Sequence, residues 1–148
     1  MKPSARHRAR EFALQGLYQW QISGNDVVAI EKHLAEVSGF DKADDELFAT
    51  LLRGAIKSAT ASQEMIAPLL DRPFAELSPV ERGILLLAAF ELHEQIATPY
   101  RVIINEAIEL AKSYGGADGH KYVNGVLDKL AAKLRVNEVA QKAAAAKR

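Results

Sequence analysis

The feature that most constrains this chain is a strongly apolar segment that follows a helix-start signal. Ser78, Pro79 and Glu81 fit a capping box with proline at the first helical position. The helix that they open contains residues 84–90, Ile-Leu-Leu-Leu-Ala-Ala-Phe, and is apolar on nearly every side. Such a helix must be covered by other helices, so it predicts the centre of a bundle. The run is far shorter than the roughly 20 apolar residues that span a bilayer, and we expect no membrane helix.

The rest of the chain shows helical spacing of apolar residues and no alternating pattern typical of strands. The expected helices lie at about residues 4–22, 26–37, 44–70 with a break near 60–62, 78 onward, 98–114 and 118–134. We therefore predict an all-α fold, a compact bundle of six to seven helices in a single domain over residues 1–135. The basic, alanine-rich segment 136–148 has no apolar stripe and is expected to be a mobile tail.

Composition restricts the class of protein further. The chain has 148 residues and is 49% hydrophobic, which is enough for a sizeable core in one domain. It contains no cysteine, which excludes disulfides, thiolate metal sites and thiol nucleophiles and fits a reducing cytoplasm. No apolar segment follows the basic N-terminus, so we expect no secretory signal and a cytoplasmic location.

The net charge of zero hides an uneven distribution. Residues 1–10 carry four basic and no acidic residues, and residues 129–148 carry six basic residues and one acidic residue. Residues 11–128 carry eighteen acidic residues against nine basic ones. The basic ends would attract a polyanion, and the acidic middle would suit a basic partner.

The sequence lacks the motifs of catalysis and of cofactor binding. No glycine-rich phosphate loop is present. His93 and Glu94 begin like a zinc-protease motif, but Ala97 stands where the second histidine ligand would be. The other histidines are scattered along the chain. We therefore predict that the protein is not an enzyme and has no metal or cofactor site.

The first helix carries a candidate binding feature. At a spacing of four residues, Arg6, Arg10, Leu14 and Tyr18 form one row. Guanidinium groups can bind phosphates, and a tyrosine can stack on an unpaired base. A solvated basic chain end, with Tyr18 packed for stability, explains the same residues, and the row alone does not decide between the two.

A second candidate lies at the start of the last predicted helix. Lys121 and Tyr122 follow a glycine-rich turn and could contact RNA, although an ordinary helix N-terminus explains them equally well. Asp118 could cap this helix. Glu81 is explained by its capping box, so a role in partner binding needs separate evidence.

Four segments carry a specific resemblance to a known family. They are residues 2–11 (KPSARHRARE), 13–20 (ALQGLYQW), 99–112 (PYRVIINEAIELAK) and 120–129 (HKYVNGVLDK). In this order they resemble the NusB family of bacterial transcription antitermination factors. The resemblance covers nearly the whole chain apart from the tail.

The resemblance implies two small helical subdomains packed together and no catalysed reaction. It implies binding to the boxA segment of nascent RNA from ribosomal RNA operons, together with ribosomal protein NusE. This pair would join an RNA polymerase complex that suppresses Rho-dependent termination. The implied RNA-binding residues are Lys2, Arg6, Arg8, Arg10, Tyr18, Lys121 and Tyr122, and Glu81 and Asp118 are assigned to the partner side. His7 stands where arginine is frequent, which would weaken the binding of phosphate.

Two alternatives remain open at the level of the sequence. A helical adaptor without sequence-specific RNA binding would also use the acidic middle of the chain. The surface that meets a partner could instead pair with itself and form a homodimer.

Overall fold

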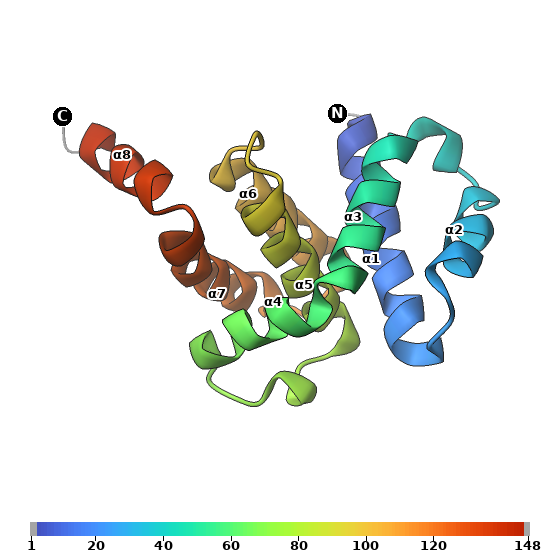
Figure 1. Cartoon of the computed structure of the whole chain (residues 1–148), viewed down its shortest axis with the longest axis horizontal. Helices are drawn as coiled ribbons and strands as arrows, with labels where there is room; N and C mark the ends of the chain where they lie inside the picture. Colours follow the sequence, from blue (N-terminus) through green and yellow to red (C-terminus); the bar gives the residue numbers. More distant parts are fainter. Residues whose placement is uncertain (1–2, 147–148) are drawn as a thin grey trace.

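The computed structural model describes residues 3–146, which fold into eight α-helices and no strand (Figure 1). The helices are α1 Ala5–Ser23, α2 Val27–Ala35, α3 Asp45–Lys57, α4 Ala59–Ile66, α5 Pro79–Glu94, α6 Tyr100–Tyr114, α7 Gly119–Leu134 and α8 Val136–Ala146. Three 3₁₀ turns, η1 Phe40–Lys42, η2 Ala67–Leu69 and η3 Phe74–Glu76, lie in the connections. The all-α prediction is confirmed. The break expected in the third segment falls at Ser58, which gives seven helices, and the eighth is α8, because the C-terminal segment is helical.

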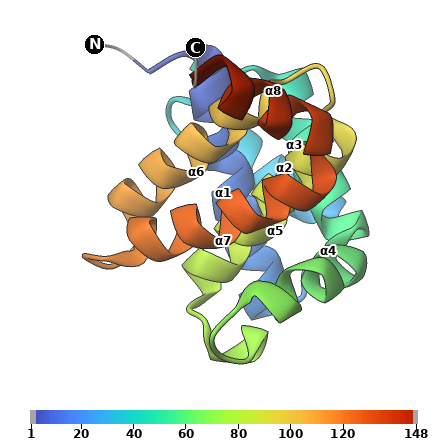
Figure 2. The ribbon, with the colours of Figure 1, turned by 90° about the vertical axis from the view of Figure 1, so that its left-hand side faces the viewer.

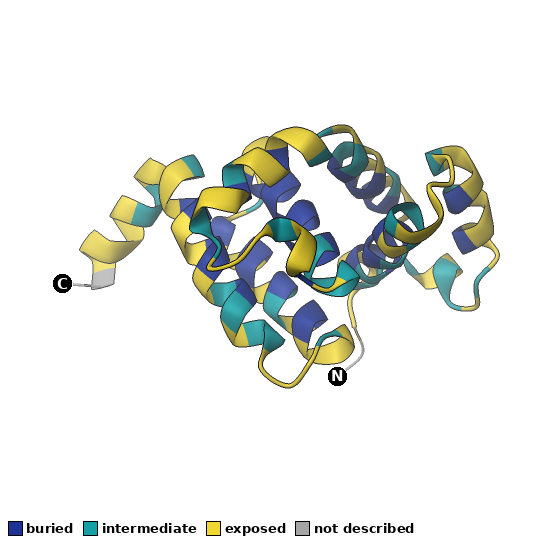
Figure 3. Cartoon of the chain, turned by 90° about the horizontal axis from the view of Figure 1, so that it is seen from below, coloured by how far each residue is buried: buried dark blue, intermediate teal, exposed yellow. Residues whose placement is uncertain are grey.

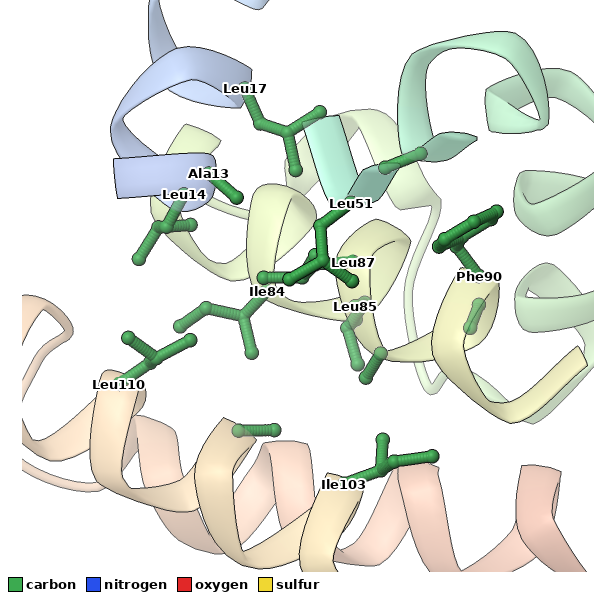
Figure 4. Close-up of a cluster of buried hydrophobic side chains, with 14 of the residues drawn as sticks. Ala13, Leu14, Leu17, Leu51, Ile84, Leu85, Leu87, Phe90, Ile103 and Leu110 are labelled. Atoms are coloured by element: carbon green, nitrogen blue, oxygen red, sulfur yellow. The ribbon is translucent and has the colours of Figure 1, made fainter. Parts of the chain in front are cut away.

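The central position of α5 is also confirmed. Its residues 83–92 are all buried, and α5 contacts α1, α3, α4, α6 and α7. Figure 4 shows Ile84, Leu85 and Leu87 of α5 surrounded by leucines and isoleucines of the neighbouring helices. The covering helices turn only one side inward and are exposed on the other (Figure 3). In the described part of the chain, no helix is both long and apolar enough to cross a membrane.

The helices form two groups on either side of α5. Helices α1–α3 lie on one side, and α4 and α6–α8 lie on the other (Figure 1). The buried residues of both groups form one continuous hydrophobic core. A surface that combines residues of both groups can therefore form only where a helix of one group lies against a helix of the other.

The start of α5 shows why the sequence signal was reliable. Ser78 is the N-cap, and its Oγ accepts a hydrogen bond from the Glu81 N–H at 3.1 Å. Pro79 occupies the first helical position, where no N–H is needed. The Glu81 carboxylate also accepts a hydrogen bond from the Ser78 hydroxyl at 3.2 Å.

The segment expected to be a mobile tail is helical over residues 136–146, and its first turn is attached to the bundle. Arg135 is 7% exposed and donates from Nε to the carbonyl oxygen of Leu92 at 2.7 Å. Its Nη1 lies 2.7 Å from Glu138 Oε1, and the other oxygen of Glu138 accepts from the Tyr100 N–H at 2.8 Å. Further carbonyl acceptors of Arg135 are Glu91, Gln95 and Thr98. We call this arrangement the Arg135 clamp; it joins the end of α5, the start of α6 and α8.

Gly54 of α3 leads to a prediction about the core. A Cβ at this position would lie 2.1 Å from Cζ of Phe90, far inside van der Waals contact. Gly54→Ala is therefore expected to lower the free energy of unfolding by about 1–3 kcal/mol, as measured by guanidinium chloride denaturation. The matched control is Gly125→Ala in α7, where a Cβ has open space and should raise that free energy by up to about 1 kcal/mol. Equal stability of Gly54→Ala and wild type would show that the ring moves aside without cost.

Candidate RNA-binding surface

The row predicted on α1 is exposed only at its two ends. Arg6 is exposed, and Tyr18 is 44% exposed. Between them Arg10 and Leu14 are buried, because α1 is covered by α3, α5 and α6 rather than by one neighbour. The row is therefore not a continuous ridge on the surface.

Arg10 is a buried partner of Glu91 in α5. Arg10 Nη2 lies 2.8 Å from Glu91 Oε1 and Nε lies 3.1 Å from Oε2, and each residue is only 2% exposed. Burial alone would lower the pKa of Arg10, but the hydrogen bonds and charge of Glu91 outweigh it and raise that pKa above its usual value. The guanidinium is thus charged and paired with Glu91 inside the protein. In this structure Arg10 is buried and does not offer its guanidinium to RNA at the surface.

The other basic residues near the N-terminus differ in their surroundings. His7 Nδ1 lies 2.5 Å from Oε2 of Glu106 in α6, so its ring faces the bundle. Arg8 is half-buried. Neither Arg6 nor Arg8 forms an ion pair within residues 3–146. Lys2 lies outside the described residues.

A cavity of about 410 Å³ opens beside Tyr18. Its second aromatic wall is Tyr114 at the end of α6, which is 40% exposed. The Tyr114 hydroxyl donates to Glu11 Oε2 at 3.0 Å, and burial together with this carboxylate raises the pKa of Tyr114. The remaining lining residues are Leu14, Gln15, Gln19 and Val80. Two half-exposed rings on an open cavity provide a platform on which unpaired bases can stack.

Tyr122 forms a second aromatic group with the loop that precedes α5. Its hydroxyl donates to Asp71 Oδ1 at 2.9 Å, and the guanidinium carbon of Arg72 lies 4.9 Å from the ring centroid. Arg72 also pairs with Asp71 at 2.9 Å, and these contacts from Arg72 and Tyr122 lower the pKa of Asp71. The side chain of Arg72 remains 47% exposed and can reach a phosphate.

Glu81 lies in the first turn of α5, next in sequence to Val80, which lines the cavity beside Tyr18. The pKa of Arg72 is raised mainly by Asp71 and further by the charge of Glu81.

Lys121 and Asp118 lie at the start of α7. Lys121 Nζ is 3.7 Å from Asp118 Oδ1, and the two side chains are 75% and 85% exposed. An ion pair with this exposure is worth little, so Lys121 is available to another anion. The expected cap is not formed, because the Asp118 side chain accepts no hydrogen bond from the first turn of α7.

The predicted tyrosines fall into two aromatic groups, one beside Tyr18 and Tyr114 and one beside Tyr122 and Arg72, and Lys121 is next to Tyr122 in the chain. We call Tyr18, Tyr114, Arg72, Lys121 and Tyr122 the aromatic surface. Arg6 precedes Tyr18 by twelve residues of α1, or roughly 18 Å. A single strand that stacks on the aromatic surface would need to extend over that length to reach Arg6 and Arg8. Within residues 3–146, no group of three or more histidine, aspartate or glutamate side chains could hold a metal ion.

The comparison with known sequences identifies a single family. The chain matches the model of the NusB family over residues 7–132. It is 65% identical over 136 residues to the transcription antitermination protein NusB of Aromatoleum aromaticum, covering 92% of this chain and 94% of the relative. It is 58% identical over 144 residues to the protein of the same name from Dechloromonas aromatica, covering 97% of this chain and 88% of the relative.

Solved structures show the same fold. The structure of T. maritima NusB superposes with a TM-score of 0.78 at 32% identity, covering 88% of this chain and 92% of that one. A chain in the crystal structure of antitermination factors NusB and NusE in complex with dsRNA superposes equally well, at 25% identity, covering 87% and 97%. The sequence and structural matches agree, and this chain belongs to the NusB family of transcription antitermination factors, a family without enzymatic activity.

Proposed function

We propose that this protein binds the boxA segment of nascent ribosomal RNA transcripts together with ribosomal protein NusE. The pair then acts in an RNA polymerase complex, in the cytoplasm, that suppresses Rho-dependent termination. The observation that carries the proposal is the aromatic surface, to which α1, α6, α7 and the loop before α5 contribute partly exposed rings and exposed cations. The solved complex of NusB and NusE with RNA supports the same assembly here.

The chemistry of the surface suits a single strand. Unpaired bases can stack on the rings of Tyr18 and Tyr114, which line the same cavity. The guanidinium of Arg72 lies over the Tyr122 ring and can neutralise a phosphate there. Lys121, next to Tyr122 in the chain, can neutralise a second phosphate. Arg6 and Arg8 supply further phosphate contacts at the other end of α1.

The position of Glu81 links the two proposed partners. A basic side chain of NusE that pairs with Glu81 would lie beside the Tyr18 cavity. Bound NusE would then lie next to the RNA and add its own contacts to it. Asp118, the second residue assigned to the partner side, precedes Lys121 at the start of α7. We therefore expect NusE to tighten the binding of RNA.

The test is fluorescence anisotropy of a labelled boxA RNA and of its scrambled control, each with and without NusE. A preference for boxA that increases with NusE is the expected result. Equal binding of both RNAs, with tight binding of NusE, would overturn the proposal in favour of an adaptor that does not read RNA. Sedimentation of the protein alone shows whether it forms a homodimer that NusE displaces.

The tyrosines give a prediction for this assay. Tyr18→Ala and Tyr114→Ala are each expected to weaken boxA binding by about fivefold to a hundredfold, because stacking of one base on an aromatic ring is worth ~1–3 kcal/mol. Tyr18→Phe is the matched control and should retain most of the affinity, since it keeps the ring. If both alanine variants bind boxA RNA like wild type, the bases do not stack in this cavity.

A further inference from the structure

A polar groove runs along the outer side of α6 and α7, which lie side by side (Figure 2). It encloses about 200 Å³, less than the roughly 300–1,000 Å³ typical of pockets for drug-sized ligands but adequate for one flat base. Its lining residues are Arg101, Ile104, Asn105 and Ile108 from α6 and Asn124 and Asp128 from α7. A guanidinium, two amides and a carboxylate therefore converge over an apolar floor.

The polar groups of the groove are not used by the fold. Within residues 3–146, the side chains of Arg101, Asn105, Asn124 and Asp128 form no hydrogen bond or ion pair with other side chains or with the backbone. Arg101, Asn105 and Asp128 are exposed, and Asn124 is half-buried. Their hydrogen-bonding capacity is therefore available to a ligand.

Two residues of the groove, and Gly125 next to one of them in the chain, weaken the helices that carry them. Asparagine is a poor helix former and glycine a worse one, yet Asn105 lies in the middle of α6 and Asn124 and Gly125 in the middle of α7. A Cβ on Gly125 would meet no atom within 4 Å, so packing inside the protein does not require glycine. Contact with another molecule accounts for all three residues, since glycine lets a ligand approach the helix backbone closely.

The position of the groove indicates the kind of ligand. The groove itself holds one cation, Arg101, and one carboxylate, Asp128. Lys112 and Lys121 lie on the same sides of α6 and α7 and form exposed ion pairs with Glu109 and Asp118, which leave both lysines available to another anion. Because Lys121 precedes Asn124 by about one turn of α7, the groove adjoins the aromatic surface, and this position favours RNA.

We propose that the groove binds one unpaired nucleotide of the RNA that lies on the aromatic surface, an inference that rests on the proposed RNA-binding function. Arg101 contacts a phosphate of this nucleotide. The amides of Asn105 and Asn124 pair with the donor and acceptor groups on the edge of its base, and Asp128 accepts from an exocyclic amine. Gly125 admits the ribose to the surface of α7. The groove therefore adds recognition of one base to a surface that otherwise stacks bases of any kind.

The experiment combines affinity with stability for Asn105→Ala/Asn124→Ala, Arg101→Gln and Gly125→Ala. In the presence of NusE, the double variant is expected to bind boxA RNA about tenfold more weakly and to lose discrimination at one position in a scan of single-base substitutions. Arg101→Gln should reduce the slope of log affinity against log salt by about 0.7, the value for one phosphate of a single strand. The melting temperatures of the double variant and of Gly125→Ala should equal or exceed that of wild type, since alanine favours the helix.

Asn137→Ala on exposed α8 is the matched control and should leave RNA affinity unchanged. If wild type prefers boxA and the groove variants bind and discriminate as wild type does, the groove inference alone is overturned. If the variants lose NusE binding while their affinity for RNA alone is retained, the groove binds protein and the inference is again overturned. If wild type itself binds no RNA, the proposed function fails together with the inference.

Discussion

Glu91→Ala is expected to lower the free energy of unfolding by about 3–5 kcal/mol, because it leaves the Arg10 guanidinium buried without its counter-ion. Glu106 cannot replace the lost carboxylate in place, since its nearest oxygen lies 3.9 Å from Arg10 Nη1 and it already pairs with His7. Guanidinium chloride denaturation followed by far-UV circular dichroism measures the effect. A loss of this size is a large part of the stability of a small domain.

The control for this prediction replaces both charges. Arg10→Met/Glu91→Leu removes the buried ion pair while retaining apolar volume, and it should recover most of the stability that Glu91→Ala loses. The double variant should also bind boxA RNA like wild type, since Arg10 does not reach the surface. Near-wild-type stability of Glu91→Ala would contradict the burial of the guanidinium. Weak RNA binding by a stable double variant would restore Arg10 to the RNA-binding set.

Arg135→Ala is expected to have an effect of similar size, about 3–5 kcal/mol. The guanidinium donates to four carbonyl oxygens and to Glu138. Each charged hydrogen bond contributes ~1.5–3 kcal/mol, and water that enters the variant would recover part of the sum. Hydrogen exchange should show faster exchange of the amides of α8 and of the Tyr100 N–H, which the clamp protects.

Lys133→Ala is the control, because Lys133 is exposed on the last turn of α7 and its removal should change the free energy of unfolding by less than about 0.5 kcal/mol. If Arg135→Ala unfolds at the same denaturant concentration as wild type, the Arg135 clamp does not stabilise the bundle. If the global stability falls while the α8 amides stay protected, α8 is held by contacts other than Arg135.

The fold was predictable wherever the signals were local. The capping residues before α5 and the apolar run inside it lie within about fifteen residues of one another, and together they specify a central helix. The burial of Arg10 could not be predicted from local sequence. A four-residue row predicts an exposed ridge only if a helix is covered on one side, and α1 packs against four helices, α2, α3, α5 and α6. Which arginine of the row becomes buried depends on Glu91, which lies 81 residues further along the chain.

The same difference between local and long-range signals applies to the candidate site. Tyr18, Lys121 and Tyr122 could be proposed because the four-residue row on α1, the glycine-rich turn before α7 and the family resemblance can all be recognised in the sequence. Tyr114 and Arg72 could not, since each is unremarkable among its neighbours and becomes part of the aromatic surface only through packing. The helical state of residues 136–146 was missed because its anchors, Arg135 and Glu138, act on backbone groups of α5 and α6.

The Arg135 clamp has a consequence for how the protein is made. The Tyr100 N–H donates to a residue 38 positions later, so this hydrogen bond at the start of α6 can form only after Glu138 has been synthesised. The carbonyl groups at the end of α5 likewise gain their partner only when Arg135 has been synthesised. Nascent chains that stop before Arg135 therefore lack the clamp at both of these helix ends. For recombinant work, the N-terminal affinity tag common in expression vectors would lie near the arginines proposed to contact RNA, whereas a tag after residue 148 would follow the clamp.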